Sequence, residues 1–220
     1  MSFRLFGSTA QLLRRDSVNS TEICDSLCDF IAAVVHNYLC RRNVYPSNSC
    51  TTFSIYGSTI QVCSNPEVRR YIAECIESLR PWLTQLKEIS IVVFRVHSNA
   101  CDKPVESLTI QFGHFSLEFL SHDVHLSVLR EYFAVCLFRI NLLETVFPVI
   151  DFETTWEFRV QFRSPVVQLN EARPVTWSKQ PAHRADQTSV CTSVIHSIKS
   201  FDNEHVQMQI LFQHDENDPP

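Results

Sequence analysis

Apolar side chains recur at three- and four-residue steps through the first strongly periodic stretch of this sequence. Between Thr21 and Arg42 the recurring residues are Ile23, Leu27, Phe30, Ile31, Val34 and Tyr38. This spacing places them on one face of a helix. Ser20 or Thr21 can cap the start of that helix, and Tyr45-Pro46 closes it because a residue before proline avoids helical angles. The sequence therefore predicts a long amphipathic helix at this position.

A second helix and a pair of strands are predicted next. Asn65-Pro66 places a capping asparagine before a proline at the first helical position, and Pro81 ends or kinks the helix. The run ISIVVFRV, from Ile89, has the pattern of a buried strand, and VESLTIQF, which ends at Phe112, alternates as a half-exposed strand. The stretch from His97 to Pro104 suits a hairpin loop between these two strands.

The second half of the chain predicts another helix and two more strands. The helix runs over about 123–146, and the cleanest alternation of the chain follows over 156–163. Beyond Ser164 a proline-interrupted polar stretch with a lone Trp177 leads to an alternating strand over 206–213. Strands and three helices without regular strand-helix-strand alternation predict an α+β domain, in which the helices pack on one face of a mixed sheet.

Composition and charge exclude several functional classes. The formal net charge of -5 argues against a general nucleic-acid surface, which needs cations for phosphate. The three glycines are far apart, so no glycine-rich phosphate loop is expected. By inspection no apolar run reaches the roughly 18 to 20 residues that span a bilayer. Residues 1–20 are predicted to be a disordered leader, although three arginines and no acid before Asp16 leave a mitochondrial transit peptide open.

The cysteines do not form a recognisable motif. All nine are scattered without a CxxC pair, which predicts reduced thiols in the cytosol or nucleus. Cys24 and Cys28 lie one helical turn apart and could offer two metal ligands, with His122 and His125 as candidates for the others. The spacing does not connect the two pairs, so buried structural cysteines are the favoured interpretation.

Sequence motifs of catalysis are missing. No GxSxG, HExxH or Walker pattern occurs in the sequence. We therefore predict no catalytic residue, no cofactor and no metal, and a thiol- or metal-dependent enzyme is the alternative from another functional class. Trp177 is more informative, because a large ring in a proline-flanked polar segment either anchors that segment to the body or lines a recognition groove. Tyr71, beside Arg69 and Arg70, is a second candidate rim residue.

Two helices and a strand carry a resemblance to a known family. The segments CDSLCDFIAAVVHNYLCRRNVYP (24–46) and NPEVRRYIAECIESLRPWL (65–83), followed by IVVFRV and Lys103-Pro104-Val105-Glu106, resemble HORMA domains. Among these, the chain is similar to the HORMA accessory subunit of translesion DNA polymerase zeta, which also occurs in the shieldin complex. The similarity is good over residues 21–112 and continues more weakly through the third helix and the tail.

The resemblance implies a division of the chain and a way of binding. A HORMA core is expected over 21–163, and a mobile safety-belt segment with an acidic C-terminal tail over 164–220. In this family the belt wraps around a short proline-containing peptide that adds a strand to the sheet, so that backbone hydrogen bonds supply affinity and side-chain pockets supply selectivity.

Residues of this chain match functional positions of the family. Tyr71 and Trp177 match positions that contact the captured polymerase peptide, and Arg130 matches an arginine used when two HORMA domains pair. The surface that receives the C-terminal domain of the Y-family scaffold polymerase is matched by Gln207, Gln209 and Leu211.

The resemblance predicts a non-catalytic adaptor. Such a protein, in the nucleus and also the cytoplasm, would bridge the catalytic subunit of DNA polymerase zeta to other translesion or repair factors, including shieldin-type proteins or another HORMA domain. Direct contact with nucleic acid or a membrane is not expected. The alternative within the family is a spindle-checkpoint or meiotic HORMA adaptor, which would use the same belt on a different peptide.

Overall fold

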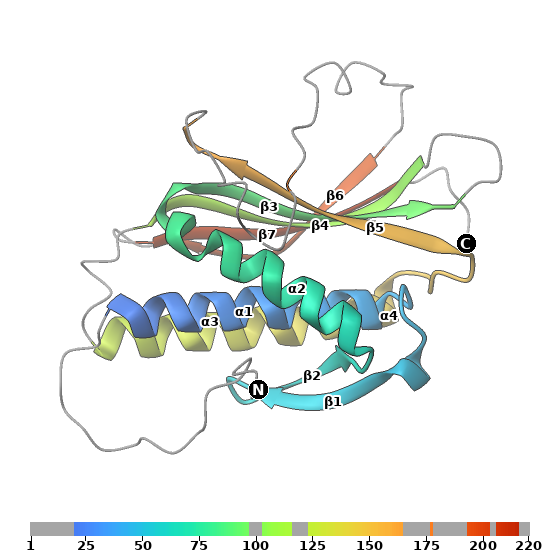
Figure 1. The fold of residues 1–220 in the computed structure, drawn as a ribbon, viewed down its shortest axis with the longest axis horizontal. Coiled ribbons are helices and arrows are strands. Elements are labelled where there is room, and N and C mark those ends of the chain that lie inside the picture. Colours follow the sequence, from blue (N-terminus) through green and yellow to red (C-terminus); the bar gives the residue numbers. More distant parts are fainter. Residues whose placement is uncertain are drawn as a thin grey trace.

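A computed structural model shows three layers, a five-stranded sheet, a layer of helices on one face of it, and a two-stranded hairpin beyond the helices (Figure 1). The structure describes the following parts of the chain: residues 20–96, 103–115, 123–164, 177, 193–202 and 206–215. This arrangement confirms the predicted α+β class with helices on one sheet face.

Helix α1 (Ser20–Arg41) is the centre of the molecule. The sheet contacts one side of it, while the other helices and the hairpin cover the rest, so that its side chains from Phe30 to Leu39 are all buried. The stretch Glu22–Arg41 is long and apolar enough to cross a membrane, contrary to the reading of the sequence by inspection, yet 83% of it is buried inside this fold. We therefore describe α1 as the core helix of the domain.

Helix α2 (Pro66–Leu79) begins and ends as its sequence predicts. The side chain of Asn65 caps it, because Oδ1 accepts a hydrogen bond from the Glu67 backbone N–H at 2.9 Å. A 3₁₀ turn, η2 (Arg80–Gln85), follows directly and contains Pro81. The proline thus marks the change of helix type.

The main sheet has the strand order β5-β3-β4-β7-β6, and every neighbouring pair is antiparallel, which corrects the expectation of a mixed sheet. Its strands are β3 (Leu86–Arg95), β4 (Lys103–Phe115), β5 (Thr154–Phe162), β6 (Ser193–Asp202) and β7 (Val206–Asp215). The predicted strands correspond to β3, β4, β5 and β7, whereas β6 was not predicted. The two edges of the sheet are β5 and β6, so the last hairpin of the chain lies at the edge opposite β5.

The third predicted helix forms in two pieces, α3 (Asp123–Asn141) and the short α4 (Leu143–Val146). Helix α3 packs along α1, with the rings of Phe30 and Phe133 stacked at a centroid distance of 3.9 Å. The two helices run parallel, since Ser26 of α1 contacts Arg130 and Asn37 contacts Asn141 of α3, and together they form a continuous apolar layer beneath the sheet.

The third layer is a hairpin that the sequence analysis did not predict. Strands β1 (Cys50–Ile55) and β2 (Ser58–Cys63) join through Tyr56-Gly57, where both residues adopt positive φ angles of 52° and 73°. Glycine at the second position makes this two-residue turn accessible. Tyr56 also donates a hydrogen bond to the Ser26 carbonyl at 2.8 Å, which fastens the hairpin tip to α1.

One cysteine pair corrects the expectation of reduced thiols. Cys40 and Cys50 form a disulfide, because the last turn of α1 brings their Cα atoms within 6.3 Å, inside the range that a disulfide requires. The described cysteines that remain free are Cys24, Cys28, Cys63, Cys75 and Cys136. The expectation is thus wrong for Cys40 and Cys50 alone among the described cysteines.

The division of the chain into leader, core and belt remains a prediction. Residues 1–19 lie outside the described part of the chain, and α1 begins at Ser20, the last residue assigned to the leader. The belt segment (164–220) contributes β6, β7 and Trp177 to the described structure.

Candidate functional site

Strand β5 presents an open edge. It pairs with β3 from Leu86↔Phe162 to Arg95↔Thr154, and no strand among the described residues pairs with its other side. An edge strand offers a row of backbone N–H and C=O groups to an added strand. The geometry therefore permits an extended guest chain to extend the sheet beyond β5.

A cavity of about 380 Å³ lies beside the first residues of β5, where α2 and the loop after α1 approach the strand. Its walls come from three separate parts of the sequence, Val44, Tyr45, Glu67, Val68, Tyr71, Thr154, Thr155 and Trp156. The cavity is thus both aromatic and polar, and it adjoins the open edge.

Three aromatic residues fix the shape of this cavity. Trp156 Nε1 donates a hydrogen bond to Tyr45 Oη at 2.8 Å, and the rings of Tyr71 and Trp156 meet edge to face at a centroid distance of 5.7 Å. Burial raises the pKa of the Tyr71 phenol to about 12, and it also raises the pKa of Tyr45. Both phenols stay neutral near pH 7. The rings that line the cavity can therefore pack on apolar or proline side chains of a ligand, and their hydroxyl groups can form hydrogen bonds.

Trp177 is fastened across the seam between α2 and β5. Its Nε1 donates to Ser78 Oγ at 3.1 Å, and its ring packs against Phe158 with centroids 6.1 Å apart. Tyr71 and Ser78 are seven residues apart on α2, so they share one helical face. The structure therefore brings both predicted peptide-binding residues to the same seam, with Tyr71 in the cavity and Trp177 further along it.

Tyr45 and Trp156 are cavity residues that the sequence analysis missed. Tyr45 was used only as the end of a helix, and Trp156 only as part of a strand pattern. Their hydrogen bond joins positions 111 residues apart in the sequence. Local spacing carries no signal for such a contact.

The predicted second-partner residues lie at the opposite end of the sheet. Gln207, Gln209 and Leu211 occupy alternate positions of β7, so they share the face that points away from the helices. Gln209 Nε2 donates to Ser197 Oγ at 3.3 Å, and a Cβ at Gly113 would overlap the Gln207 side chain. Glycine is thus needed where β4 passes this residue. The three residues form a surface separate from the cavity.

Arg130 lies on α3, away from the α2–β5 seam. Its Nη2 atom is 3.2 Å from Glu22 Oε1 and donates to Ser26 Oγ at the same distance. The predicted pairing arginine therefore binds α1 within its own chain.

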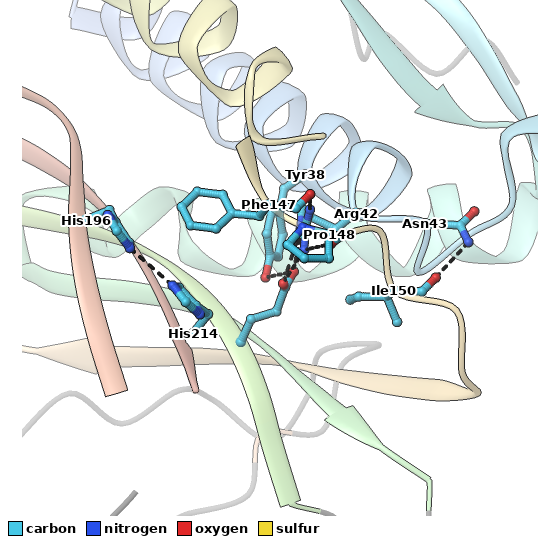
Figure 2. A network of polar contacts seen from close by, with 9 residues as sticks. Tyr38, Arg42, Asn43, Phe147, Pro148, Ile150, His196 and His214 are labelled. Atoms are coloured by element: carbon cyan, nitrogen blue, oxygen red, sulfur yellow. Dashed lines mark hydrogen bonds and ion pairs between the residues drawn. The ribbon is translucent and has the colours of Figure 1, made fainter. Parts of the chain in front are cut away.

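A buried ion pair between Arg42 and Glu106 lies where the end of α1 meets β4 (Figure 2). Arg42 Nη2 lies 2.9 Å from Glu106 Oε2, and both side chains are at most 3% exposed. Tyr38 Oη donates to the same carboxylate at 2.9 Å, and Arg42 Nη2 also donates to the Pro148 carbonyl at 2.7 Å. One guanidinium therefore joins α1 and β4 to the segment that leads into β5.

Two histidines of the last hairpin lie against that same segment (Figure 2). The Nε2 atoms of His196 and His214 are 3.2 Å apart, and Phe147 packs on both rings at centroid distances of 4.9 and 5.0 Å. These contacts attach the β6–β7 hairpin to the start of the β5 segment through aromatic packing.

The candidate metal ligands do not form a site within the described residues. Those residues contain no group of three or more His, Cys, Asp and Glu side chains suited to a metal ion. Burial raises the pKa of the Cys28 thiol to about 12, which makes it a poor nucleophile. His122 and the side chain of His125 lie outside the described part of the chain.

Comparisons with known proteins agree with this geometry. No protein-family model matches the chain. The mitotic spindle assembly checkpoint protein MAD2B of Danio rerio is 24% identical over 137 residues, 62% of this chain and 64% of that protein. The human MAD2B protein is 25% identical over 135 residues, 61% of this chain and 63% of its own length. The chain thus matches a little under two thirds of these relatives.

Solved structures share the fold at low sequence identity. A chain of the mitotic checkpoint complex superposes with a TM-score of 0.68 at 14% identity, covering 87% of this chain and 98% of that one. HTP-2 of C. elegans, bound to the HIM-3 closure motif, superposes with a TM-score of 0.65 at 14% identity, covering 90% and 92%. The chain thus shares the fold of HORMA-domain structures, and its sequence is similar to that of the MAD2B proteins.

Proposed function

We propose that this chain is a non-catalytic adaptor that captures a short proline-containing peptide from the catalytic subunit of DNA polymerase zeta. In this proposal it bridges that subunit to other translesion or repair factors in the nucleus. The observation that carries the proposal is the open edge of β5 with an aromatic cavity beside it.

In this proposal the open edge and the cavity make different contributions to peptide recognition. Backbone groups of β5 pair with any extended guest, so they supply affinity without selecting a sequence. The rings of Tyr45, Tyr71 and Trp156 select what the guest carries at that point, and flat aromatic walls suit proline. Trp177 of the proposed belt segment is hydrogen-bonded to Ser78 of α2 and packs on Phe158 of β5. In this proposal the belt holds a guest at β5.

The relatives support peptide capture and leave its partner to experiment. The HTP-2 structures are described as complexes with closure motifs, whereas the MAD2 relatives carry the name of the spindle checkpoint. The choice of polymerase zeta as the partner rests on the sequence resemblance over residues 21–112. The Y-family scaffold polymerase at Gln207, Gln209 and Leu211, shieldin-type partners and HORMA pairing at Arg130 belong to the same proposal.

A direct test uses short overlapping peptides that tile the polymerase zeta catalytic subunit of the same organism, with the HIM-3 closure motif as a second probe. Alanine at Tyr71 should weaken binding by about tenfold or more, because it removes a ring from the wall of the pocket. Alanine at Trp177 should mainly accelerate dissociation. Phe138→Ala is the matched control, since Phe138 is an exposed ring on α3 away from the seam.

The outcomes separate the two partners. Binding of a polymerase peptide that depends on Tyr71 and Trp177 supports the proposal. Binding of the HIM-3 motif alone would favour a checkpoint or meiotic adaptor. Polymerase-peptide binding unchanged by both substitutions would overturn the assigned site, and proteins co-purified from the native cell would identify the physiological guest.

A further inference from the structure

Three cysteines meet where α1 ends. Cys40 and Cys50 are joined by a disulfide, and Cys63 is the cross-strand partner of Cys50 in the β1–β2 hairpin. Cys63 is free and fully buried, whereas Cys50 is partly exposed. Directly opposed residues in an antiparallel pair have Cα separations of roughly 4.5 to 5.5 Å, which also falls in the range of a disulfide. Cys50 therefore has two partners within reach.

The disulfide closes the loop that forms one wall of the cavity. The loop between Cys40 and Cys50 carries Val44 and Tyr45, both of which line the cavity. Within this loop the Tyr45 backbone N–H donates to the Leu39 carbonyl at 3.3 Å, and the Tyr45 hydroxyl accepts from Trp156 on the open edge strand. The covalent link therefore lies at the base of the loop that positions this ring.

We propose that Cys40, Cys50 and Cys63 form a thiol-oxidation site that controls how firmly the cavity holds a guest peptide. The proposal rests on the proposed peptide-binding function for its consequence, and on the geometry of the three cysteines for the site itself. Oxidation joins Cys40 to Cys50 and holds the Tyr45 loop closed. Reduction opens the link and leaves the loop held by its hydrogen bonds and by the packing of Val44 and Tyr45 on the core.

The oxidation step balances with hydrogen peroxide as the oxidant. The Cys50 thiolate attacks one peroxide oxygen, which gives a sulfenic acid at Cys50 and hydroxide, and the hydroxide takes a proton to become water. The Cys40 thiol then attacks the Cys50 sulfur, the S–S bond forms, and the sulfenic oxygen leaves as a second water. Two thiols lose two electrons and two protons in total, and one peroxide becomes two waters.

Cys63 provides a route that needs no external oxidant or reductant. Its thiolate can attack the Cys50 sulfur, form a Cys50–Cys63 bond and release Cys40 as a thiolate, which then takes up the proton lost by Cys63. This exchange keeps the number of disulfides constant. It moves the link from the α1–β1 junction into the hairpin and thereby opens the Tyr45 loop.

Loop closure should act on affinity through preorganisation. In the reduced state a guest must order the Tyr45 side chain and its loop on binding, and immobilising one such side chain costs enough to weaken binding about three- to tenfold. Oxidised protein should therefore bind the same peptide about three- to tenfold more tightly.

The experiment uses the full chain, equilibrated in glutathione buffers that range from reducing to oxidising and then blocked with N-ethylmaleimide. Intact mass and peptide mapping report which cysteines are linked. Hydrogen–deuterium exchange of residues 41–49 reports the loop without any ligand, and binding of the tiled polymerase peptides and the HIM-3 motif reports the consequence. Cys50→Ser removes both links, Cys63→Ser removes only the exchange, and Cys24→Ser is the control at a free cysteine of α1.

The expected result is a Cys40–Cys50 link that forms reversibly, slower exchange over 41–49 when it is present, and tighter peptide binding. Cys50→Ser should match the reduced protein in both readouts, and Cys24→Ser should behave as the parent. Equal exchange rates over 41–49 in both states would overturn the proposal. So would one equivalent of zinc held by the reduced protein and lost in Cys50→Ser, because the three thiols would then be metal ligands.

The two proposals fail in different ways. Redox-dependent exchange over 41–49 with no peptide bound in either state supports the oxidation site and overturns the proposed function. Equal peptide binding in both states supports peptide capture and overturns the control of affinity by oxidation.

Discussion

The two outer sides of the main sheet differ in how much apolar surface they bury. At one edge, β7 and β6 from the end of the chain cover β4, and Val206, Ile210 and Phe212 of β7 are fully buried. At the other, β5 buries only Phe158, its remaining side chains are half-buried or exposed, and its outer side pairs with no described strand. The outer side of β6 likewise pairs with no described strand, so the two sides differ in the apolar burial of β7 and in the cavity beside β5 rather than in strand pairing. In the proposed function, the guest adds to the β5 side.

The largest effect should come from breaking the buried ion pair between Arg42 and Glu106. Arg42→Leu leaves the Glu106 carboxylate buried without its guanidinium, and such a loss costs about 3 to 5 kcal/mol. Chemical denaturation would measure it. The double variant Arg42→Leu with Glu106→Leu should recover most of the lost stability; a double variant as unstable as the single one would contradict this account.

Alanine substitutions on β7 and β5 should cause smaller losses of folding free energy and allow the two sides of the sheet to be compared. Phe212→Ala removes a fully buried ring of β7 and should cost about 3 kcal/mol, whereas Val160→Ala on β5 should cost about 1 kcal/mol. Urea unfolding of both variants gives the comparison. Equal losses would mean that the two edges contribute alike to the stability of the free protein.

Substitution in the cavity should leave stability nearly unchanged and act on the guest. Tyr71 is 43% exposed, so Tyr71→Ala should cost less than about 1 kcal/mol of folding free energy while weakening peptide binding by about tenfold or more. Denaturation and fluorescence anisotropy on the same preparation measure both quantities. A large stability loss with unchanged affinity would place Tyr71 in the structural core instead.

Protonation of His36 on α1 should lower the stability of the folded protein as the pH falls. Burial lowers the pKa of His36 to about 4 from an unfolded value near 6.5, so the unfolded chain binds the proton first and stability falls as pH drops through this range. This contribution amounts to about 1 kcal/mol between about pH 7 and about pH 5.5. Asp29 acts with the opposite sign, because burial raises the pKa of its carboxyl to about 7.

The difference between the parent and His36→Gln therefore isolates the histidine. The parent should lose more stability than the variant over that pH interval in thermal or urea unfolding. Identical pH profiles would show that His36 takes up its proton as readily in the folded protein as in the unfolded chain.

The smallest effect is expected on the outer face of β7. Leu211 is only partly buried among Thr109 and Ser197, so Leu211→Ala should change stability by about 0.5 kcal/mol or less. Binding of the Y-family scaffold polymerase domain should fall if this face receives it. Calorimetry with that domain, and with Phe138→Ala as the control, distinguishes the two surfaces.

The sequence predicted the elements whose apolar period is regular. Helix α2 shows its cap, its apolar face and its terminating proline within a short span of sequence, and all three are local. Strand β6 was missed because its alternation breaks where the register with β7 shifts between Ser197 and Lys199. The more buried residues are His196 and Ile198 up to the shift and Phe201 after it. A bulge changes the face of every later side chain.

The site was harder to predict than the fold. Tyr71 and Trp177 were singled out from the local sequence as candidate groove residues and assigned to the captured peptide by the family resemblance, and both lie along the α2–β5 seam. Tyr45 and Trp156 form the rest of the aromatic wall through a contact between distant parts of the chain. The Cys40–Cys50 link likewise depends on where β1 starts relative to α1, and the hairpin that fixes this was not predicted. Contacts that depend on tertiary packing produce no periodic pattern in the sequence.

The buried pair of Arg42 and Glu106 also constrains how the strands can align while the protein folds. A shift of β4 by two residues would keep its apolar side chains on the inner face, so hydrophobic burial alone would tolerate the error. The same shift would carry the Glu106 carboxylate about 7 Å along the strand, away from its guanidinium and into an apolar layer. A single ion pair thereby rejects a misaligned sheet that the rest of the core would accept.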